Sequence, residues 1–200
     1  MHQFINFLTS GFIIGSFSLF ALNPVSIPED TADEPPSTPP QEAAQVVAAI
    51  GDLKKDSQDE VLWLARIIYS ETKRPDEMRL VGWVARNRVE IGFRGNNYYE
   101  VATAPGQFSG LNARDLEYYN NISLGHGDLA NPSWVQALAI ANAVYTAPAS
   151  ERPFPITVLH FYSPHILKVP PEWAERGELV LAVASGKGGA DRFHFYNNVK

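Results

Sequence analysis

The clearest helical pattern of apolar residues places an acid on its own apolar face. A helix is predicted over residues 58–72, where Ser57 followed by Glu60 has the pattern of an N-terminal capping box. Glu71 lies at the far end of this helix. Three apolar residues precede it by seven, four and three positions and therefore share its face: Leu64, Ile67 and Ile68. The sequence thus predicts a carboxyl group on the buried side of a helix end.

Two further helices are predicted from their end signals and apolar spacing. The second covers residues 76–91, between Pro75 and Gly92. The third lies between Asn131-Pro132 and Pro148, and its apolar stripe consists of Trp134, Leu138, Ala141 and Tyr145. An ordinary core helix accounts for this stripe.

Strands are predicted where β-branched and aromatic residues gather. Residues 156–162 read "ITVLHFY" and residues 191–199 read "DRFHFYNNV". Loops rich in Gly, Asn and Tyr separate the predicted elements. The expected fold class is therefore α+β, mainly helical with a small antiparallel sheet.

The N-terminal part differs in composition from the rest. Residues 1–22 contain an uncharged, mostly apolar stretch at 4–22, which indicates either a signal peptide or a membrane anchor. Residues 23–50 are rich in Pro, acids and small residues, and we expect a disordered linker there, with the folded domain at 51–200. Because acids follow the apolar stretch and no Lys or Arg precedes it, we expect the domain to lie outside the cytoplasm.

Charge and composition exclude several classes of function. The net charge of the 200 residues is -6, and positions 1–52 carry all of it, so the remaining body is neutral. No cluster of Lys and Arg interleaves with aromatic residues, which argues against nucleic-acid binding. The chain has no cysteine, and its His residues are scattered without the paired spacing of a zinc hydrolase, so no metal site is expected.

Glu71 is the residue whose setting points to chemistry. Burial and the negative end of the helix dipole would both raise its pKa, which would suit a general acid. The alternative is a structural role, in which Glu71 turns outward to cap a backbone group or to pair with Lys73, Arg74 or Arg79. From the pattern alone, both readings stay open.

Glycoside cleavage is the best-known chemistry that uses such a glutamic acid, which protonates the leaving oxygen. A hydrolase normally needs a second carboxylate, and spacing does not choose among the candidates, which are Asp76, Glu77, Asp115, Glu117 and Asp128. A lytic transglycosylase needs one acid only, because the same carboxylate then deprotonates a hydroxyl of the substrate and an anhydro ring closes. One prominent acid slightly favours this second route.

Four blocks, in this order, carry a resemblance to a known family: "LARIIYSETKRPDEMRLVGWVARNRVE", "PGQFSGL", "LHFYSP" and "GADRFHFY". Over residues 61–196 the chain resembles the cell-wall hydrolases of the spore cortex-lytic enzyme (SleB-type) family. The resemblance implies a lysozyme-like fold that cleaves the glycan strands of peptidoglycan between MurNAc and GlcNAc, as a muramidase or lytic transglycosylase, with no metal or other cofactor.

The resemblance also assigns roles to single residues. The acid of the family falls on Glu71, and its cleft-lining blocks fall on Gln107, Phe108, Ser109 and Tyr162. Alternation along the predicted strand would place Tyr162 on one face with His160 and Val158. Asn87 and Arg88 match a block for which we expect a structural role.

Three departures from the family pattern concern the surroundings of these residues. The turn after the acid is shortened to "TKRPDE", Ser163 stands where Asn is common, and "GADRF" lacks a His that often precedes the final Arg. The competing hypothesis is a tethered module that binds glycans without cleaving them. Its sugar platforms would be found among Trp83, Trp134, Trp173 and the pairs Tyr98-Tyr99 and Tyr118-Tyr119. Glu71 at the helix end is the feature that separates the two hypotheses.

Overall fold

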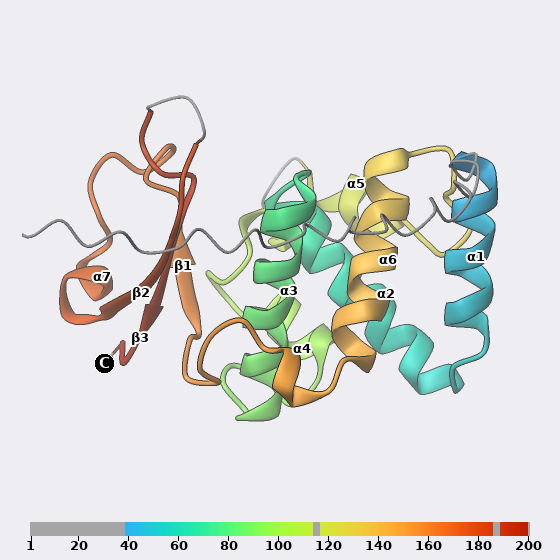
Figure 1. Cartoon of the computed structure of the whole chain (residues 1–200), viewed down its shortest axis with the longest axis horizontal. Helices are drawn as coiled ribbons and strands as arrows, with labels where there is room; N and C mark the ends of the chain where they lie inside the picture. Colours follow the sequence, from blue (N-terminus) through green and yellow to red (C-terminus); the bar gives the residue numbers. More distant parts are fainter. Residues whose placement is uncertain (1–38, 114–116, 186–188, 200) are drawn as a thin grey trace, which may run out of the picture. The chain divides into compact units, whose positions relative to one another are not determined.

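The computed structural model describes residues 39–113, 117–185 and 189–199 and confirms the α+β class (Figure 1). The helices are α1 (Pro39–Gly51), α2 (Lys55–Glu71), α3 (Pro75–Glu90), α4 (Tyr98–Thr103), α5 (Tyr118–Ser123), α6 (Pro132–Thr146) and α7 (Glu172–Arg176). The strands are β1 (His160–Tyr162), β2 (Glu178–Val183) and β3 (Phe193–Asn197). The predicted leader and the first part of the predicted linker lie outside these residues. Within them, no helix is both long enough and apolar enough to cross a membrane.

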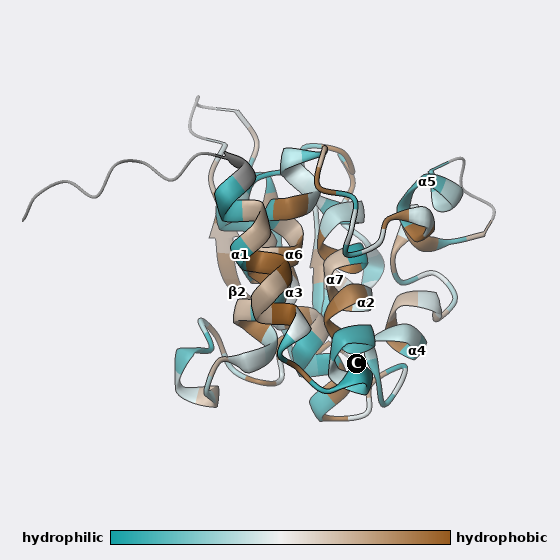
Figure 2. Ribbon diagram, turned by 90° about the vertical axis from the view of Figure 1, so that its right-hand side faces the viewer, coloured by the Kyte–Doolittle hydropathy of each residue, from teal (hydrophilic) through white to brown (hydrophobic). Residues whose placement is uncertain are grey.

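Helices α2, α3 and α6 pack on one another and contain most of the core. Their apolar faces meet there, and Figure 2 shows hydrophobic residues along α6 and α2. Trp83 of α3 and Trp134 of α6 are both fully buried. Gly82 lets the helices approach closely, because a Cβ at this position would lie 3.1 Å from the Ile68 Cδ1 atom and 3.3 Å from the Val144 Cγ2 atom.

The three predicted helices exist, but the predicted capping box does not. Helix α2 begins at Lys55, so Ser57 lies inside its first turn. The Ser57 hydroxyl accepts a hydrogen bond from the Tyr145 hydroxyl at 3.1 Å, and the Glu60 carboxylate accepts one from the Tyr98 N–H at 2.9 Å. Both side chains therefore bind tertiary partners instead of the helix end.

The end signals of the other two helices act as predicted. Pro75 occupies the first turn of α3, and α3 ends just before Gly92, whose φ is +70°. The Asn131 side chain caps α6 by accepting a hydrogen bond from the Trp134 N–H at 3.1 Å.

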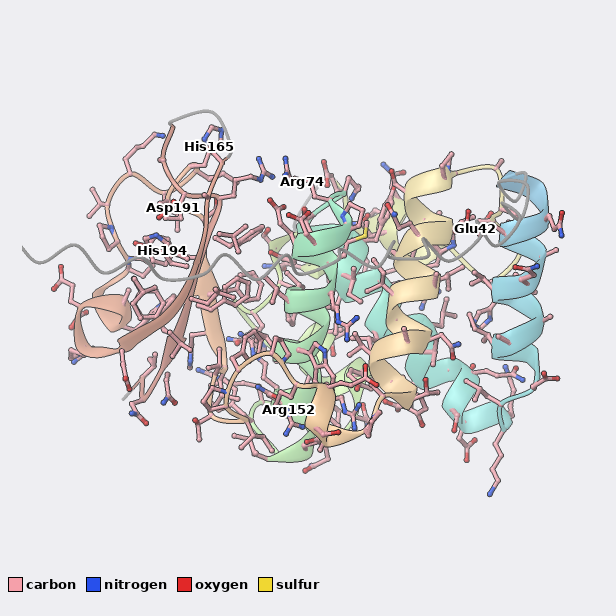
Figure 3. The ribbon with its side chains drawn as sticks, viewed as in Figure 1. Glu42, Arg74, Arg152, His165, Asp191 and His194 are labelled. Atoms are coloured by element: carbon pink, nitrogen blue, oxygen red, sulfur yellow. The ribbon has the colours of Figure 1, made fainter. Side chains whose placement is uncertain are left out.

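The linker prediction is wrong for residues 39–50, which belong to helix α1. This helix packs on α6 and on α2. Ala43 and Ile50 are buried and Val46 packs against the core, while Glu42 is exposed (Figure 3). The proline and acid content that suggested disorder ends near Glu42, and the following Ala- and Val-rich residues have helical apolar spacing. The folded domain therefore begins about a dozen residues earlier than predicted.

The contribution of α1 to stability can be measured at Ile50. Because this side chain is 2 % exposed, we expect Ile50→Ala to lower the free energy of unfolding by about 2 kcal/mol through lost burial and a residual cavity. Ile166, which is 75 % exposed, provides the control, and Ile166→Ala should change stability by less than about 0.5 kcal/mol. Urea unfolding of both variants gives the comparison. Equal midpoints would show that α1 does not contribute to the cooperative fold.

The sheet is antiparallel with the strand order β1-β3-β2. Both predicted strands exist but are shorter than their apolar patterns, and β2, whose sequence ELVLAV lacks apolar and polar alternation, was not predicted. Alternation in β3 directs Phe195 toward the main core and Tyr196 toward the other face, where Trp173 of α7 covers it. On that second face the His194 ring lies 2.8 Å from the Asp191 carboxylate (Figure 3).

Candidate active site

Glu71 is the last residue of α2, at the point where the apolar face of the helix reaches the edge of the core. Leu64, Ile67 and Ile68, which share that face, are fully buried as predicted. Thr72 ends the helix with extended backbone angles, and its N–H still donates to the Ile68 carbonyl at 3.2 Å. Glu71 keeps part of its surface accessible. The carboxyl group itself is enclosed by protein, and other parts of the residue keep some exposure.

Burial raises the pKa of Glu71 from 4.5 to about 7. Loss of hydration is the dominant cause, and the positive charges of Arg88 and Lys73 partly oppose it. The direction agrees with the expectation from the sequence. At neutral pH a substantial fraction of Glu71 therefore carries a proton that it can donate.

The cations proposed as structural partners of Glu71 have other contacts. Lys73 donates to the Tyr69 carbonyl and lies 3.4 Å from the centre of the Tyr69 ring. Arg74 pairs with Glu77 at 3.1 Å, and Arg79 pairs with Glu151 at 3.1 Å. Within the described residues no ion pair of 4 Å or less involves Glu71. The outward, ion-paired alternative therefore does not describe this structure.

Arg88 places a buried guanidinium near Glu71. Its Nε donates to the Leu159 carbonyl at 2.8 Å, and its guanidinium carbon lies 5.0 Å from the centre of the Phe108 ring. Burial lowers the pKa of Arg88 to about 10, and the Glu71 charge opposes this shift. The buried Nη1 has no hydrogen-bond partner among the described residues.

Asn87 and Arg88 both fix the segment that leads into β1. The Asn87 amide donates to the carbonyls of Pro155 and Val158, at 3.2 and 3.0 Å. The expected structural role is thus visible in their contacts. The electrostatic contact of Arg88 with Glu71 was missed, because 17 positions separate the two residues in the sequence and no local pattern joins them.

The segment that contains Gln107, Phe108 and Ser109 lies against the end of α2. Its short helical turn, Ser109–Leu111, packs on α2, and a Cβ on Gly110 would lie 3.1 Å from the Ser70 Cβ atom. The buried Asn121 amide donates to the Gly110 carbonyl at 2.7 Å and holds the turn in place. The sequence blocks around Glu71 and Gln107 are therefore neighbours in space.

The three predicted cleft residues of this segment differ in exposure. Gln107 is half-buried and Ser109 is exposed, so both are accessible to a ligand. Phe108 is 2 % exposed, and its ring packs against Phe161 and beneath Arg88. Phe108 is thus a core residue that supports the segment, which corrects the expectation that it lines a cleft.

Tyr162 belongs to a different part of the structure. It packs in the second aromatic cluster with Trp173 and Tyr196, whereas its neighbour Phe161 contacts Phe108 and the main core. His160 also contacts Trp173, so it shares the face of Tyr162 as predicted, but Val158 is buried in the main core. Phe161 faces the segment beside Glu71, so Tyr162 lies on the opposite face of the sheet. This corrects the expectation that Tyr162 lines a cleft with Gln107 and Ser109.

A polar pocket of about 460 Å³ lies beside the same end of α2. Its lining residues come from α2 and the turn after it, from α5 and the residue before it, and from the connection between α5 and α6: Tyr69, Lys73, Glu117, Asn120, Asn121, Ser123, Leu124 and Asn131. Lys73 lines the pocket and interacts electrostatically with both Glu117 and Glu71. Its charge therefore acts on both the pocket carboxylate and the candidate acid.

The candidates for a second carboxylate have distinct surroundings. Glu77 is fully buried among cationic partners, Asp76 is exposed, and Asp128 accepts a hydrogen bond from the Gly125 N–H at 2.6 Å. Glu117 lines the polar pocket. Asp115 lies outside the described residues. Among the described candidates, Glu117 is the one that interacts with Lys73, the cation that also interacts with Glu71.

The aromatic residues proposed as sugar platforms are mostly enclosed. Trp83 and Trp134 are fully buried and Tyr98 is 4 % exposed, so none of these three offers a ring face to a ligand. Tyr99 and Tyr119 are exposed, but Tyr99 packs edge-on against Trp63. In the part of the chain that the structure describes, no group of three His, Asp or Glu residues is placed to hold a metal ion.

Comparisons of the chain with models of protein families, with curated proteins and with solved structures found no match.

Proposed function

We propose that this protein cleaves peptidoglycan glycan strands at the bond between MurNAc and GlcNAc, with Glu71 as the general acid. The observation that carries the proposal is the Glu71 carboxyl group at the end of α2, whose pKa burial raises to about 7, in a residue that is itself only partly buried. A carboxylic acid in such surroundings can protonate the oxygen of a leaving sugar at neutral pH. The resemblance of the sequence to cell-wall hydrolases with a lysozyme-like fold supports the choice of substrate.

The surroundings of Glu71 suit both the donation of its proton and the carboxylate that remains afterwards. Glu71 would transfer its proton to the glycosidic oxygen, and the bond from that oxygen to the sugar ring would break as positive charge develops on the ring. The carboxylate that results would be stabilised by Arg88 and Lys73, the two cations that lower its pKa. Gln107 and Ser109 provide polar groups for sugar hydroxyl or N-acetyl groups on the adjacent segment.

Two routes can complete the reaction. In a lytic transglycosylase, the Glu71 carboxylate would take a proton from a hydroxyl group of the substrate, whose oxygen closes an anhydro ring. In a muramidase, a second carboxylate would assist attack by water, and Glu117 is then the described candidate because it interacts with the same Lys73. The prominence of one acid favours the transglycosylase route.

The substrate also defines where the protein would work. Peptidoglycan lies outside the cytoplasm, and the apolar stretch at residues 4–22 would then export the chain or tether it to the membrane. We therefore place the protein in the cell envelope, as a periplasmic or extracellular enzyme that is secreted or anchored at its N-terminus.

The pH dependence of the reaction provides a direct test. Because the protonated form of Glu71 is the active acid, we expect the rate of fragment release from purified peptidoglycan to fall as the pH rises through about 7. Above that value the rate should fall about tenfold for each further pH unit, in proportion to the protonated fraction. A rate that stays constant between pH 6 and 9 would contradict this role of Glu71.

The same digests separate the possible reactions. Mass spectrometry of the soluble fragments distinguishes anhydro ends, which a transglycosylase leaves, from reducing ends, which a hydrolase leaves. A protein that sediments with peptidoglycan but releases no fragments would instead support the glycan-binding module.

A further inference from the structure

The connection between β1 and α7, residues 163–171, exposes three aliphatic side chains to solvent. Among the large apolar residues that the structure describes, Ile166 and Val169 have the highest exposed fractions, 75 % and 78 %, and Leu167 between them is 47 % exposed. Figure 1 shows this connection on the side of the sheet away from α3 and α6. The core therefore does not use these side chains, although their exposure to water is unfavourable. We call residues 163–171 the apolar loop.

Local hydrogen bonds hold the apolar loop in this conformation. The N–H groups of Ile166 and Leu167 both donate to the Ser163 carbonyl, at 3.1 and 2.8 Å. The Lys168 ammonium donates to the His165 carbonyl at 2.7 Å. The loop also has proline at both ends, which restricts the backbone there. The aliphatic side chains are therefore presented outward by a formed turn.

The charges around the apolar loop favour a partner that is both apolar and anionic. Residues 152–171 contain Arg152 and Lys168 but no acid. Glu172, the first acid after the loop, pairs with Arg176 at 3.2 Å. A bilayer offers both chemistries, because its acyl chains accept aliphatic side chains and its phosphate groups accept a Lys ammonium. A polar ligand in solution would leave the aliphatic side chains in water.

The length of the chain before α1 allows the apolar loop to reach a membrane. The sequence predicts a signal peptide or membrane anchor at residues 4–22. The chain from residue 23 to residue 38 can span at most about 55 Å, whereas a domain of about 160 residues is about 40 Å across. Any face of the domain can therefore meet the bilayer that holds an anchor at residues 4–22.

We propose that the apolar loop inserts into the surface of the membrane, with Ile166, Leu167 and Val169 among the acyl chains and Lys168 at the phosphate groups. The inference rests on the proposed location in the cell envelope and not on the reaction at Glu71. Insertion of the loop would add a second attachment point to the N-terminal anchor. It would hold the domain against the bilayer in one orientation.

Fluorescent labels on the full-length chain test this insertion. The chain has no cysteine, so Val169→Cys provides a single labelling site in the loop. Ile91→Cys provides the control site, since Ile91 is 45 % exposed and follows α3 on the other side of the sheet. Each labelled chain is incorporated into vesicles of phosphatidylethanolamine and phosphatidylglycerol that carry a lipid-bound quencher. Residues 4–22 are the same in both chains, so an anchor alone brings both labels near the bilayer.

We expect the Val169→Cys label to be quenched at least about threefold more than the Ile91→Cys label, because inserted apolar side chains lie about 5–10 Å into the boundary between head groups and acyl chains. Equal quenching of the two labels would overturn the proposal. That result would leave the aliphatic side chains to a partner other than the membrane.

A charge placed in the apolar loop provides a second test. Ile166→Asp in the Val169→Cys chain puts a carboxylate where the acyl chains would be, so quenching should fall to the value of the Ile91→Cys label. Tyr119→Asp is the matched control, because Tyr119 is 70 % exposed on α5 and the substitution changes the net charge equally. It should leave the quenching unchanged. Equal quenching with Ile166→Asp and with Tyr119→Asp would contradict insertion of the loop.

The outcome for the apolar loop is independent of the outcome for catalysis. Protein that sediments with the vesicles but shows equal quenching at both labels refutes the loop and leaves the anchor standing. Protein that stays in solution, with neither label quenched, refutes both. Release of fragments from peptidoglycan by the wild-type chain tests the reaction separately, whichever of these results is found.

Discussion

Glu71→Gln is expected to lower the rate of fragment release from peptidoglycan by about 100- to 10,000-fold. Gln keeps the shape and polarity of the side chain but has no proton to donate at the pKa of about 7 that burial gives Glu71. The residual rate should no longer follow the ionisation of this group. Initial rates of fragment release, measured from pH 5 to 9 for both proteins, provide the comparison.

Glu71→Gln is expected to lower activity but to raise the stability of the protein above pH 7. Folding raises the pKa of Glu71 from 4.5 to about 7, so between these values the folded chain holds more of this proton than the unfolded chain. The contribution of Glu71 to stability is therefore fully present below pH 4.5 and is lost as the pH rises through 7. Gln avoids the buried charge, so the variant should melt at a higher temperature than the parent at pH 8. At pH 5 the melting temperatures of the variant and the parent should differ less.

Glu151→Gln serves as the control for both measurements. Glu151 is exposed and pairs with Arg79 at the surface, so its substitution should leave activity and melting temperature nearly unchanged. A Glu71→Gln protein that releases fragments as fast as the Glu151→Gln protein would exclude Glu71 as the acid. Loss of activity with a lowered melting temperature would instead indicate a structural role.

Local spacing predicted the part of the site that depends on one helix. The intervals from Leu64, Ile67 and Ile68 to Glu71 placed the acid on the buried face, and Pro75 and Asn131 marked helix starts correctly. Each of these signals acts within a few residues, where helix geometry fixes which side chains meet.

The failures concern residues whose partners are distant in the sequence. Ser57 and Glu60 had the pattern of a cap, but Tyr145 and Tyr98 bind them instead. Strand β2 was missed because its sequence, ELVLAV, has no alternation of apolar and polar residues, and its pairing with β3 is what defines it. Tertiary contacts of this kind leave no periodic signal in the chain.

The exposure of aromatic residues was also not readable from the sequence. Phe108 and Tyr162 both lie in blocks that resemble cleft-lining segments, yet Phe108 packs in the main core and Tyr162 in the second cluster. Their neighbours Gln107 and Ser109 remain accessible. Which residue of such a block faces a ligand depends on how the block packs, and packing is a property of the whole fold.

The shortened turn "TKRPDE" is fixed by a buried carboxylate that the sequence did not single out. Glu77 is 0 % exposed, accepts a hydrogen bond from the Thr72 hydroxyl at 2.5 Å, and pairs with Arg74 at 3.1 Å. Arg192, just before β3, donates to both carboxylate oxygens of Glu77, with its Nη2 at 3.3 Å. Thr72 follows Glu71 directly, so this cluster links the candidate acid to the sheet.

Arg192→Met is expected to destabilise the protein by about 3 kcal/mol. It would leave the Glu77 carboxylate buried with Arg74 as its remaining cation, and Arg74 is about half exposed. Removing one partner of a fully buried ion pair costs about 3–5 kcal/mol because the remaining charge stays poorly compensated. The lower end is expected here because the Arg192 side chain is 33 % exposed. Arg176→Met is the control, since Arg176 and Glu172 form an exposed pair, for which the expected loss is below about 1 kcal/mol.

Urea unfolding measures the stability of both variants, and fragment release at a temperature where both stay folded measures activity. Arg192→Met should also slow fragment release, because the turn that holds Thr72 and Glu71 loses an anchor to the sheet. Equal stability losses in the two variants would show that the Glu77 cluster behaves like a surface ion pair. Because Arg192 and Glu77 are 115 positions apart in the sequence, a selective loss in Arg192→Met would show that this long-range contact helps to hold the turn after Glu71 in place.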